Sequence, residues 1–123
     1  MLPVPDTRFS RDARLTNAFQ YTRVFDKNNR SADRYWTVLS RENKQQEQVM
    51  PARLGMAVAK KCARRAVDRN RLKRLARESF RQHKHSMAGF DIVLLARLAS
   101  VTASNQDILT SLEKHWTRVA KNA

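Results

Sequence analysis

The chain has 123 residues, of which 25 are Lys or Arg and 11 are Asp or Glu, so its formal net charge is +14. This length is typical of one domain with one hydrophobic core. So large an excess of positive charge is best tolerated beside an anionic partner, and it indicates a polyanion. The single cysteine, Cys62, excludes an intramolecular disulfide and a thiolate zinc cluster, and it fits a reducing compartment such as the cytoplasm.

The sequence predicts one domain over residues 1–123 and no segment that inserts into a membrane. Its longest uninterrupted apolar run, Ile92 to Ala96, is too short to span a bilayer. Residues 1–15 contain Pro3 and Pro5 and show no sustained hydrophobic period, so we expect them to form an extended arm. The two prolines also argue against a secretory signal there.

The first predicted element is a short helix over about residues 17–25. Tyr21, Val24 and Phe25 share one side of it by their three- and four-residue spacing, and Thr16 is the expected N-cap. These residues form a narrow apolar stripe, so the helix should pack one side against the rest of the domain.

Two strands with two-residue alternation are predicted next. They cover Tyr35 to Arg41 and Arg53 to Ala59, and the polar stretches Asp26 to Asp33 and Glu42 to Gln48 are expected to be loops. In the second strand one face carries large apolar side chains and the other carries mostly small ones, which favours a sheet with one face in the core.

The last three predicted elements are a helix, a strand and a helix. The first helix runs from about Ala66 to His83, and the strand from Asp91 to Arg97 is apolar enough to be buried on both faces. Ser104 is the expected N-cap of the final helix. The residues predicted to face the core from the first of these helices are Leu72, Leu75, Ala76, Ser79 and Phe80. Those predicted to do so from the final helix are Ile108, Leu112, Trp116 and Val119.

The positive charge is concentrated between Lys60 and Arg81, where ten cations and two acids give a net charge of +8 in 22 residues. At 100° per residue, one set of polar side chains lies opposite the apolar stripe of the helix, and we call it the cationic ridge. It comprises Asn70, Lys73, Arg74, Arg77 and Arg81. Ordinary solvated helix faces mix charge signs, whereas this set has no acid and is rich in arginine, which suits phosphate.

The order of elements favours RNA over DNA as the polyanion. A DNA-reading helix is usually placed by a preceding helix and a tight turn, whereas a strand precedes this one. Aromatic residues at Tyr21, Phe25 and Tyr35 fit the stacking of unpaired bases. For Tyr21 and Phe25 the sequence leaves two alternatives open, because an aromatic stripe at helical spacing is also typical of a core.

The sequence predicts no catalytic residue and no metal site in the protein. A magnesium-dependent nuclease needs converging carboxylates, whereas Asp68 and Glu78 lie among cations on a helix and are expected to pair with them. His83 and His85 diverge by about 200° on a helix, which argues against joint metal ligation. His115 is expected on the flank of the final helix.

The run from Arg53 to Arg81, RLGMAVAKKCARRAVDRNRLKRLARESFR, resembles the signature of the bacterial ribonuclease P protein component. That signature is a strand ending in G-x-x-V-x-K-K, followed by a helix with R-N-R-x-K-R and R-E-x-F. The resemblance extends to an N-terminal R-L-x-x-x-x-x-[FY]-x-x-V-F pattern that begins at Arg14, to the apolar strand and to the final helix. It covers nearly the whole chain.

The resemblance implies a fold and a function. The fold is a two-layer α/β sandwich of the ribosomal protein S5 domain 2-like kind, ordered helix, strands, helix, strand, helix, with a left-handed β-α-β crossover. The function is that of the protein subunit of ribonuclease P, in which a catalytic RNA removes the 5′ leader of precursor tRNA. The implied partners are ribonuclease P RNA and precursor tRNA, with no DNA or membrane. The resemblance further implies that the protein itself binds no cofactor and that the RNA subunit requires Mg²⁺.

The resemblance also implies two groups of binding residues. The catalytic RNA would contact the ridge and its neighbours, namely Lys60, Lys61, Arg64, Arg65, Arg69, Asn70, Arg71, Lys73, Arg74, Arg77 and Arg81. The leader would lie in a cleft between the first helix and the sheet, lined by Tyr21, Phe25, Tyr35, Thr37 and Leu39. The alternatives are a generic RNA-binding or ribosomal structural protein, and a self-sufficient nuclease.

Overall fold

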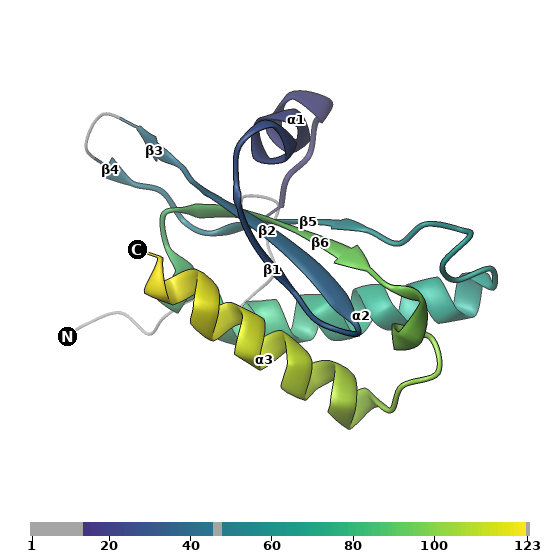
Figure 1. Ribbon diagram of the computed structural model, residues 1–123. Coiled ribbons are helices and arrows are strands. Elements are labelled where there is room, and N and C mark those ends of the chain that lie inside the picture. Colours follow the sequence, from purple (N-terminus) through teal and green to yellow (C-terminus); the bar gives the residue numbers. More distant parts are fainter. Residues whose placement is uncertain (1–13, 46–47, 123) are drawn as a thin grey trace.

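A computed structural model describes residues 14–45 and 48–122 of the chain, and the predicted arm lies outside them except for Arg14 and Leu15. The elements in chain order are α1 (Ala18–Asp26), β1 (Asn29–Ala32), β2 (Trp36–Glu42), β3 (Lys44–Gln45), β4 (Gln48–Val49), β5 (Arg53–Ala57), α2 (Ala66–His83), β6 (Phe90–Ala96) and α3 (Asn105–Lys121). Short 3₁₀ helices cover Lys84–Met87 and Leu98–Ser100. Figure 1 shows α2 and α3 side by side on one face of the sheet and α1 across the other.

The main sheet has the strand order β1-β2-β6-β5. β2 is antiparallel to both β1 and β6, whereas β5 and β6 are parallel neighbours. The connection from β5 to β6 runs through α2, so these three elements form the expected β-α-β unit. A separate two-stranded sheet joins β3 and β4.

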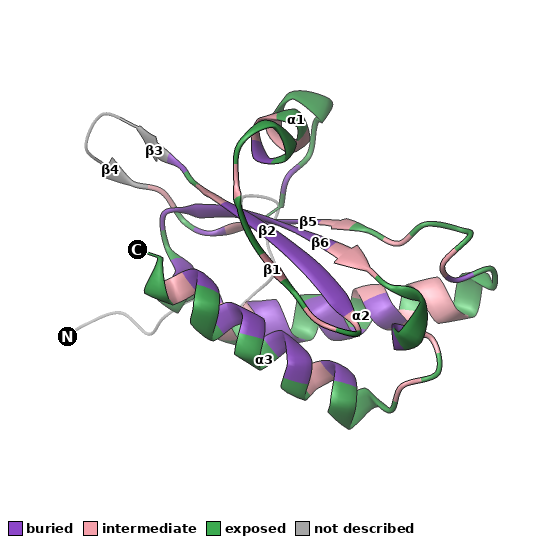
Figure 2. Ribbon diagram, in the orientation of Figure 1, coloured by how far each residue is buried: buried purple, intermediate pink, exposed green. Residues whose placement is uncertain are grey.

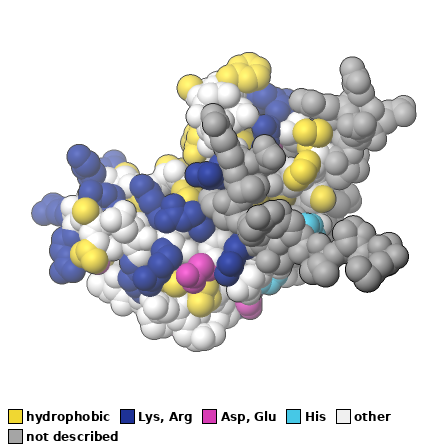
Figure 3. All heavy atoms as spheres, turned by 180° about the vertical axis from the view of Figure 1, so that it is seen from behind, with side chains coloured by type: hydrophobic (Ala, Val, Ile, Leu, Met, Phe, Trp, Pro, Cys, Tyr) yellow, Lys and Arg dark blue, Asp and Glu magenta, His cyan; other side chains and the backbone are white. Residues whose placement is uncertain are grey.

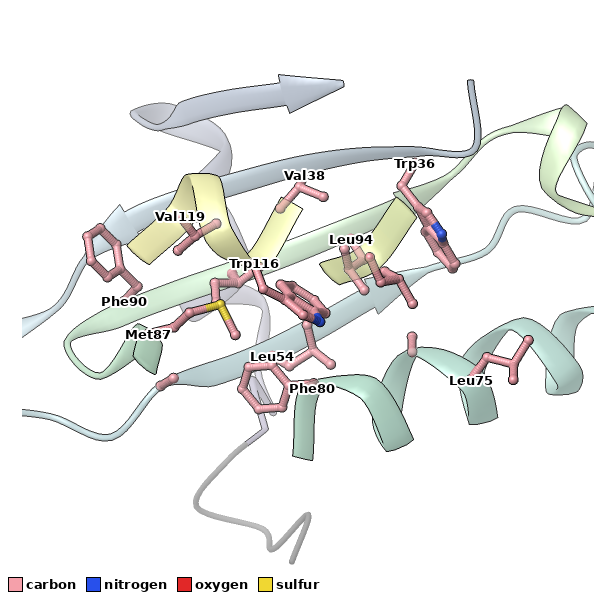
Figure 4. Close-up of a cluster of buried hydrophobic side chains, with 14 of the residues drawn as sticks. Trp36, Val38, Leu54, Leu75, Phe80, Met87, Phe90, Leu94, Trp116 and Val119 are labelled. Carbon is pink, nitrogen blue, oxygen red and sulfur yellow. The ribbon is translucent and has the colours of Figure 1, made fainter. Parts of the chain in front are cut away.

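The main core lies between the sheet and the helix pair α2 and α3 (Figures 2 and 4). All five residues predicted to face the core from α2, and all four predicted from α3, are buried. Phe80 and Trp116 meet edge to face with ring centroids 5.8 Å apart, and the Trp116 indole Nε1 donates a 2.8 Å hydrogen bond to Ser79 Oγ. The stripe of the cationic helix is therefore held by specific packing as well as by apolar burial.

A second, smaller cluster attaches α1 to the opposite face of the sheet. Its buried residues are Leu15, Val24, Leu39 and Val93, and Tyr21 and Leu95 pack against it half-buried. At its flank, Asp91 is almost completely buried and accepts two hydrogen bonds of 2.7 and 2.8 Å from Arg53. Arg23 of α1 lies 3.6 Å from the same carboxylate, so an ion pair also joins the helix to the sheet.

Three local predictions were wrong. The stretch from Glu42 to Gln48, predicted as a loop, contains the last residue of β2, strand β3 and the first residue of β4. The N-cap of α1 is Asn17 rather than Thr16, because Asn17 and Gln20 form a reciprocal capping box. The stretch from Asp26 to Asp33, predicted as a loop, contains strand β1. This strand shows no alternation because it is a sheet edge, and three of its four residues are exposed.

Candidate RNA-binding surfaces

The outward face of α2 and the loop before it form one basic surface. Lys and Arg side chains gather there when the molecule is seen from behind (Figure 3). Asn70, Arg74 and Arg77 are exposed, and Lys73 and Arg81 are half-buried. Lys60, Lys61, Arg64 and Arg65 are exposed on the loop.

The expectation of an acid-free ridge is corrected by Glu78. This residue is exposed and lies one turn after Arg74 and three residues before Arg81, on the same side of α2. Asp68 pairs with Arg65 at 3.4 Å, as expected for a structural acid. The surface therefore carries a strong cationic excess without being free of negative charge.

Two of the arginines predicted to contact RNA are already engaged within the protein. Arg69 donates hydrogen bonds of 2.9 and 2.8 Å to the carbonyl oxygens of Ala63 and Arg64, which fixes the basic loop. Its guanidinium therefore shapes the surface, and fewer of its donors are free for a ligand.

Arg71 is engaged more extensively, across the junction between α2 and the start of α3. It donates 2.5 Å and 3.4 Å hydrogen bonds to the carbonyls of Ala103 and Val101, and a 2.8 Å bond to Asn105 Oδ1. The arginines at positions 74 and 77 have no such partners among the described residues. The arginines predicted to contact RNA thus divide into structural and available guanidinium groups.

The face of the sheet that carries α1 can be resolved into rows from the strand register. One row, Arg30, Leu39, Val93 and Gly55, runs under α1. The next row, Ala32, Thr37, Leu95 and Ala57, we call the open row, because Ala32 and Ala57 are exposed and Leu95 is half-buried.

The aromatic residues of α1 lie beside the open row. Tyr21 packs on Gly55, and Arg23 points to the other flank of α1, toward Asp91. Residues two apart on a helix diverge by about 200°, which places Phe25 on the flank away from Arg23 and over the open row. Phe25 is 49% exposed, so it is a surface residue rather than part of a closed core.

Comparison with known proteins identifies the family. A family model described as Ribonuclease P matches residues 9–120. The chain belongs to the ribonuclease P protein family. The ribonuclease P protein component of Thioalkalivibrio sulfidiphilus (strain HL-EbGR7) is 45% identical over 115 residues, which cover 94% of this chain and 92% of that protein.

Solved structures of the same family share the fold. The RNase P protein of Staphylococcus aureus, in a mutant with defective mRNA degradation activity, superposes with a TM-score of 0.77 at 33% identity, covering 89% of this chain and 88% of that one. The RNase P protein of Thermotoga maritima gives a TM-score of 0.73 at 29% identity, and the match covers 85% of this chain and 96% of that one. The predicted α/β architecture is confirmed by these neighbours.

Within this ribonuclease P protein, the three residues predicted to line the leader cleft from the strand side differ in their surroundings. Leu39 is 6% exposed beneath α1, so it offers little surface to a ligand. Tyr35 packs against the main core cluster and not against the α1 cluster. Thr37 belongs to the open row but is itself buried.

Sequence reasoning missed a polar network around His115, which is fully buried and not at a helix flank. Its Nδ1 lies 2.8 Å from Ser31 Oγ and its Nε2 lies 3.2 Å from Asp33 Oδ2. Asp33 also accepts a hydrogen bond from Ser111. The partners are about 80 residues apart in the chain, so no local pattern could have revealed them.

The pKa values in this network are shifted by identifiable causes. Burial disfavours the charged imidazolium and lowers the pKa of His115 from 6.5, although the neighbouring Asp33 carboxylate acts in the opposite direction. Burial raises the pKa of Asp33, but hydrogen bonds from Ser111 and from the backbone of Trp36 and Tyr35 outweigh it, and the net shift is downward from 3.8. His115 is thus favoured as a neutral ring beside an ionised carboxylate.

No cluster of three or more His, Cys, Asp or Glu side chains suited to a metal ion occurs in the part of the chain that the structure describes. None of the helices within residues 14–45 and 48–122 has the length and apolarity needed to cross a membrane.

Cys62 is half-buried, with Sγ 3.5 Å from the carbonyl oxygen of Ala96, and burial raises the pKa of its thiol.

Proposed function

We propose that this chain is the RNA-binding subunit of ribonuclease P, in which the RNA subunit carries out magnesium-dependent removal of the 5′ leader from precursor tRNA. The observation that carries the proposal is the family match over residues 9–120. The basic surface of α2 gives that match a physical basis, because exposed arginines suit a phosphate backbone. The assembly is proposed to act in the cytoplasm.

The two surfaces would divide the work. The available guanidinium groups of Arg74 and Arg77, with the basic loop, would bind the catalytic RNA. The open row, flanked by Tyr21 and Phe25, would hold the unpaired leader, because small side chains admit the backbone and aromatic rings stack on bases. Positioning the leader in this way would raise the affinity for precursor tRNA over mature tRNA.

The same features separate the proposal from its two alternatives. A generic RNA-binding or ribosomal protein would bind ribonuclease P RNA without changing cleavage. A self-sufficient nuclease would need its own acids or a metal site, and Asp68 is engaged with Arg65 at 3.4 Å. Cleavage chemistry is therefore assigned to the RNA and its magnesium ions.

Reconstitution tests the proposal directly. We expect ribonuclease P RNA at low Mg²⁺ to cleave precursor tRNA at least about tenfold faster with this protein than without it. An unrelated basic protein of similar charge is the control for nonspecific charge screening. Failure to stimulate beyond that control would contradict the proposal. Cleavage by RNA-free protein that disappears in Asp68→Ala would instead support a protein-borne nuclease.

A further inference from the structure

A polar groove lies at the edge of the sheet where β1 meets the C-terminal end of α3. It consists of two adjacent hollows of about 430 and 300 Å³ that share Asn29, Ser40 and Asn122. We call it the edge groove. The remaining lining of the larger hollow is Arg30, Ser31, Ala32, Arg118, Val119 and Lys121. The smaller hollow adds Lys27, Asn28, Arg41 and Glu42.

The charge of the groove is strongly positive. Three cations and no acid line the larger hollow, and the smaller one adds two cations and one acid. Arg30 and Lys121 are exposed, and neither has an acidic partner among the described residues. Arg118 is held in place by a 3.0 Å hydrogen bond from its Nη1 to Ser31 Oγ. Unpaired and pre-positioned cations of this kind suit phosphate groups.

The floor of the groove contains a polar group without a partner. Ser40 is 2% exposed and lines both hollows, and within the described part of the chain its hydroxyl makes no hydrogen bond. Because Ser40 Oγ is not one of the fully enclosed polar atoms without a partner, it keeps some access to solvent, and a ligand in the groove can reach it. The amides of Asn29 and Asn122 beside it supply both donors and acceptors.

The edge groove is separate from the basic surface of α2, and it meets the open row only at Ala32. It lies along β1, whereas the basic loop and α2 follow β5 at the opposite edge of the sheet. Its lining comes from β1 and the residues before it, from β2 and from the C-terminal end of α3, and no residue of α2 contributes. An RNA segment bound here would be a different segment from the one on the cationic ridge.

A purely structural explanation covers only part of the groove. Cations near a helix C-terminus interact favourably with its carbonyl groups, which would account for Arg118 and Lys121 at the end of α3. It does not account for Arg30, which is on a strand, or for the unpartnered hydroxyl of Ser40. A ligand with phosphate and hydrogen-bonding groups accounts for all four.

We infer that the edge groove binds the backbone of a further RNA segment, with phosphates at Arg118 and Lys121 on the α3 side of the edge strand and at Arg30 on its α1 side, and with polar sugar or base atoms at Ser40 and the two asparagines. The inference rests on the proposed function, because it assigns an additional contact within the same ribonucleoprotein. The segment comes either from the catalytic RNA or from the tRNA, and both present the same phosphodiester chemistry.

The test compares two variants with equal loss of charge. Arg30→Ala/Lys121→Ala alters the groove without touching the network at His115. Arg34→Ala/Lys114→Ala removes two exposed cations that line neither hollow, one of them also on α3. The dissociation constant is measured at several salt concentrations, first for protein with ribonuclease P RNA, then for holoenzyme with precursor and mature tRNA. Melting temperatures check that both variants fold.

We expect the groove variant to bind one of these RNAs about tenfold more weakly than the control variant, with the salt slope reduced by about one to two. Weakening toward ribonuclease P RNA assigns the segment to the catalytic RNA. Weakening toward both tRNAs assigns it to the tRNA body. Equal behaviour of the two variants with every RNA overturns the inference. If variants of the cationic ridge still lose affinity for ribonuclease P RNA in that case, the proposed function stands. A wild-type protein that fails to bind ribonuclease P RNA overturns the proposed function itself.

Discussion

The ring of Tyr21 lies directly on the backbone of Gly55, so closely that a Cβ atom at position 55 would come within 2.5 Å of the ring's Cε1 atom. Glycine is required here for space, because no other residue leaves room for an aromatic ring on this part of β5. The pair fixes where α1 crosses the sheet and how Tyr21 stands beside the open row. Leader binding is therefore expected to depend on a glycine that touches no RNA.

Gly55→Ala should reduce discrimination between precursor and mature tRNA. The half-buried Tyr21 ring can swing outward to relieve the clash, so we expect a modest loss of stability with a displaced stacking surface. Holoenzyme with this variant should bind precursor tRNA several-fold more weakly, since stacking is worth about 1 to 3 kcal/mol per base. Its affinity for mature tRNA should be unchanged. Equilibrium binding of the two RNAs measures the difference.

Gly89→Ala is the matched control. Gly89 has φ = 90°, a left-handed conformation that costs other residues roughly 1 to 2 kcal/mol. It should lower the melting temperature and leave the ratio of the two tRNA affinities at the wild-type value. If Gly55→Ala shows this same pattern, the position of Tyr21 is a matter of stability alone.

Phe25→Ala should separate a binding role from a packing role. A core aromatic cut back to alanine costs about 3 to 5 kcal/mol, whereas Phe25 is 49% exposed and should cost much less. We expect about tenfold weaker binding of precursor tRNA at a near-normal melting temperature, with mature tRNA unaffected.

Phe19→Ala provides the control for Phe25→Ala. Phe19 is 73% exposed on the same helix, and its position places it away from the sheet-facing side of α1. Its loss should change neither affinity by more than about twofold. Comparable weakening toward both RNAs in Phe25→Ala would argue against leader stacking.

The long amphipathic elements could be predicted from sequence because their patterns are local. The bounds of α2 and its buried stripe agree with the 3.6-residue period over five turns, and Ser104 caps α3 with a 3.1 Å bond from the Asp107 amide. β6 shows as a run of apolar residues because it is an inner strand. In each case one short segment contains all the information.

The features that could not be predicted depend on contacts between residues distant in the sequence. β1 has no apolar period because its edge position leaves it mostly exposed, and its polar residues resemble a loop. Arg71 and Arg74 are both α2 arginines predicted to contact RNA, yet only Arg71 meets the carbonyl groups before α3. The sequence therefore predicted where the cationic surface lies, but not which guanidinium groups are free.

The arginines of α2 should consequently differ in their effects. Arg74→Ala and Arg77→Ala should each weaken binding to ribonuclease P RNA and lower the salt slope by up to about one, without changing the melting temperature. Arg71→Ala should lower stability by about 1 to 3 kcal/mol, because it removes charged hydrogen bonds to two half-buried carbonyl groups and to the exposed Asn105 side chain. Thermal unfolding and RNA titration distinguish the two classes.

Arg71→Lys serves as the control, because it keeps the charge but cannot reproduce the forked hydrogen bonds. We expect it to lose nearly as much stability as Arg71→Ala. Full stability in both substitutions would show that the junction between α2 and α3 does not depend on this side chain. A triple variant at positions 71, 74 and 77 that binds ribonuclease P RNA with wild-type affinity would show that this face of α2 is only a solvated surface.

The buried His115 should make stability fall on mild acidification. Its pKa in the folded protein is lowered from 6.5 by burial, so the unfolded chain takes up a proton at higher pH than the folded one. Above about pH 6.5 the ring is neutral in both states and its contribution to stability is fully present. As the pH falls below 6.5 toward the lower folded-state pKa, protonation favours the unfolded chain and that contribution is lost. Asp33 adds nothing in this window, because its pKa lies below 3.8.

His115→Gln tests the assignment. Glutamine can keep a hydrogen bond to Ser31 or Asp33 but does not titrate, so its melting temperature should change less than that of the wild type between about pH 7.5 and about pH 5. Its stability at pH 7.5 is expected to be lower, because no amide reproduces both ring contacts at 2.8 and 3.2 Å. The readout is the slope of melting temperature against pH, which separates titration from packing. Parallel slopes in the two proteins would mean that another group carries the acid sensitivity, and that the Ser31–His115–Asp33 network is held equally well in both charge states of the ring.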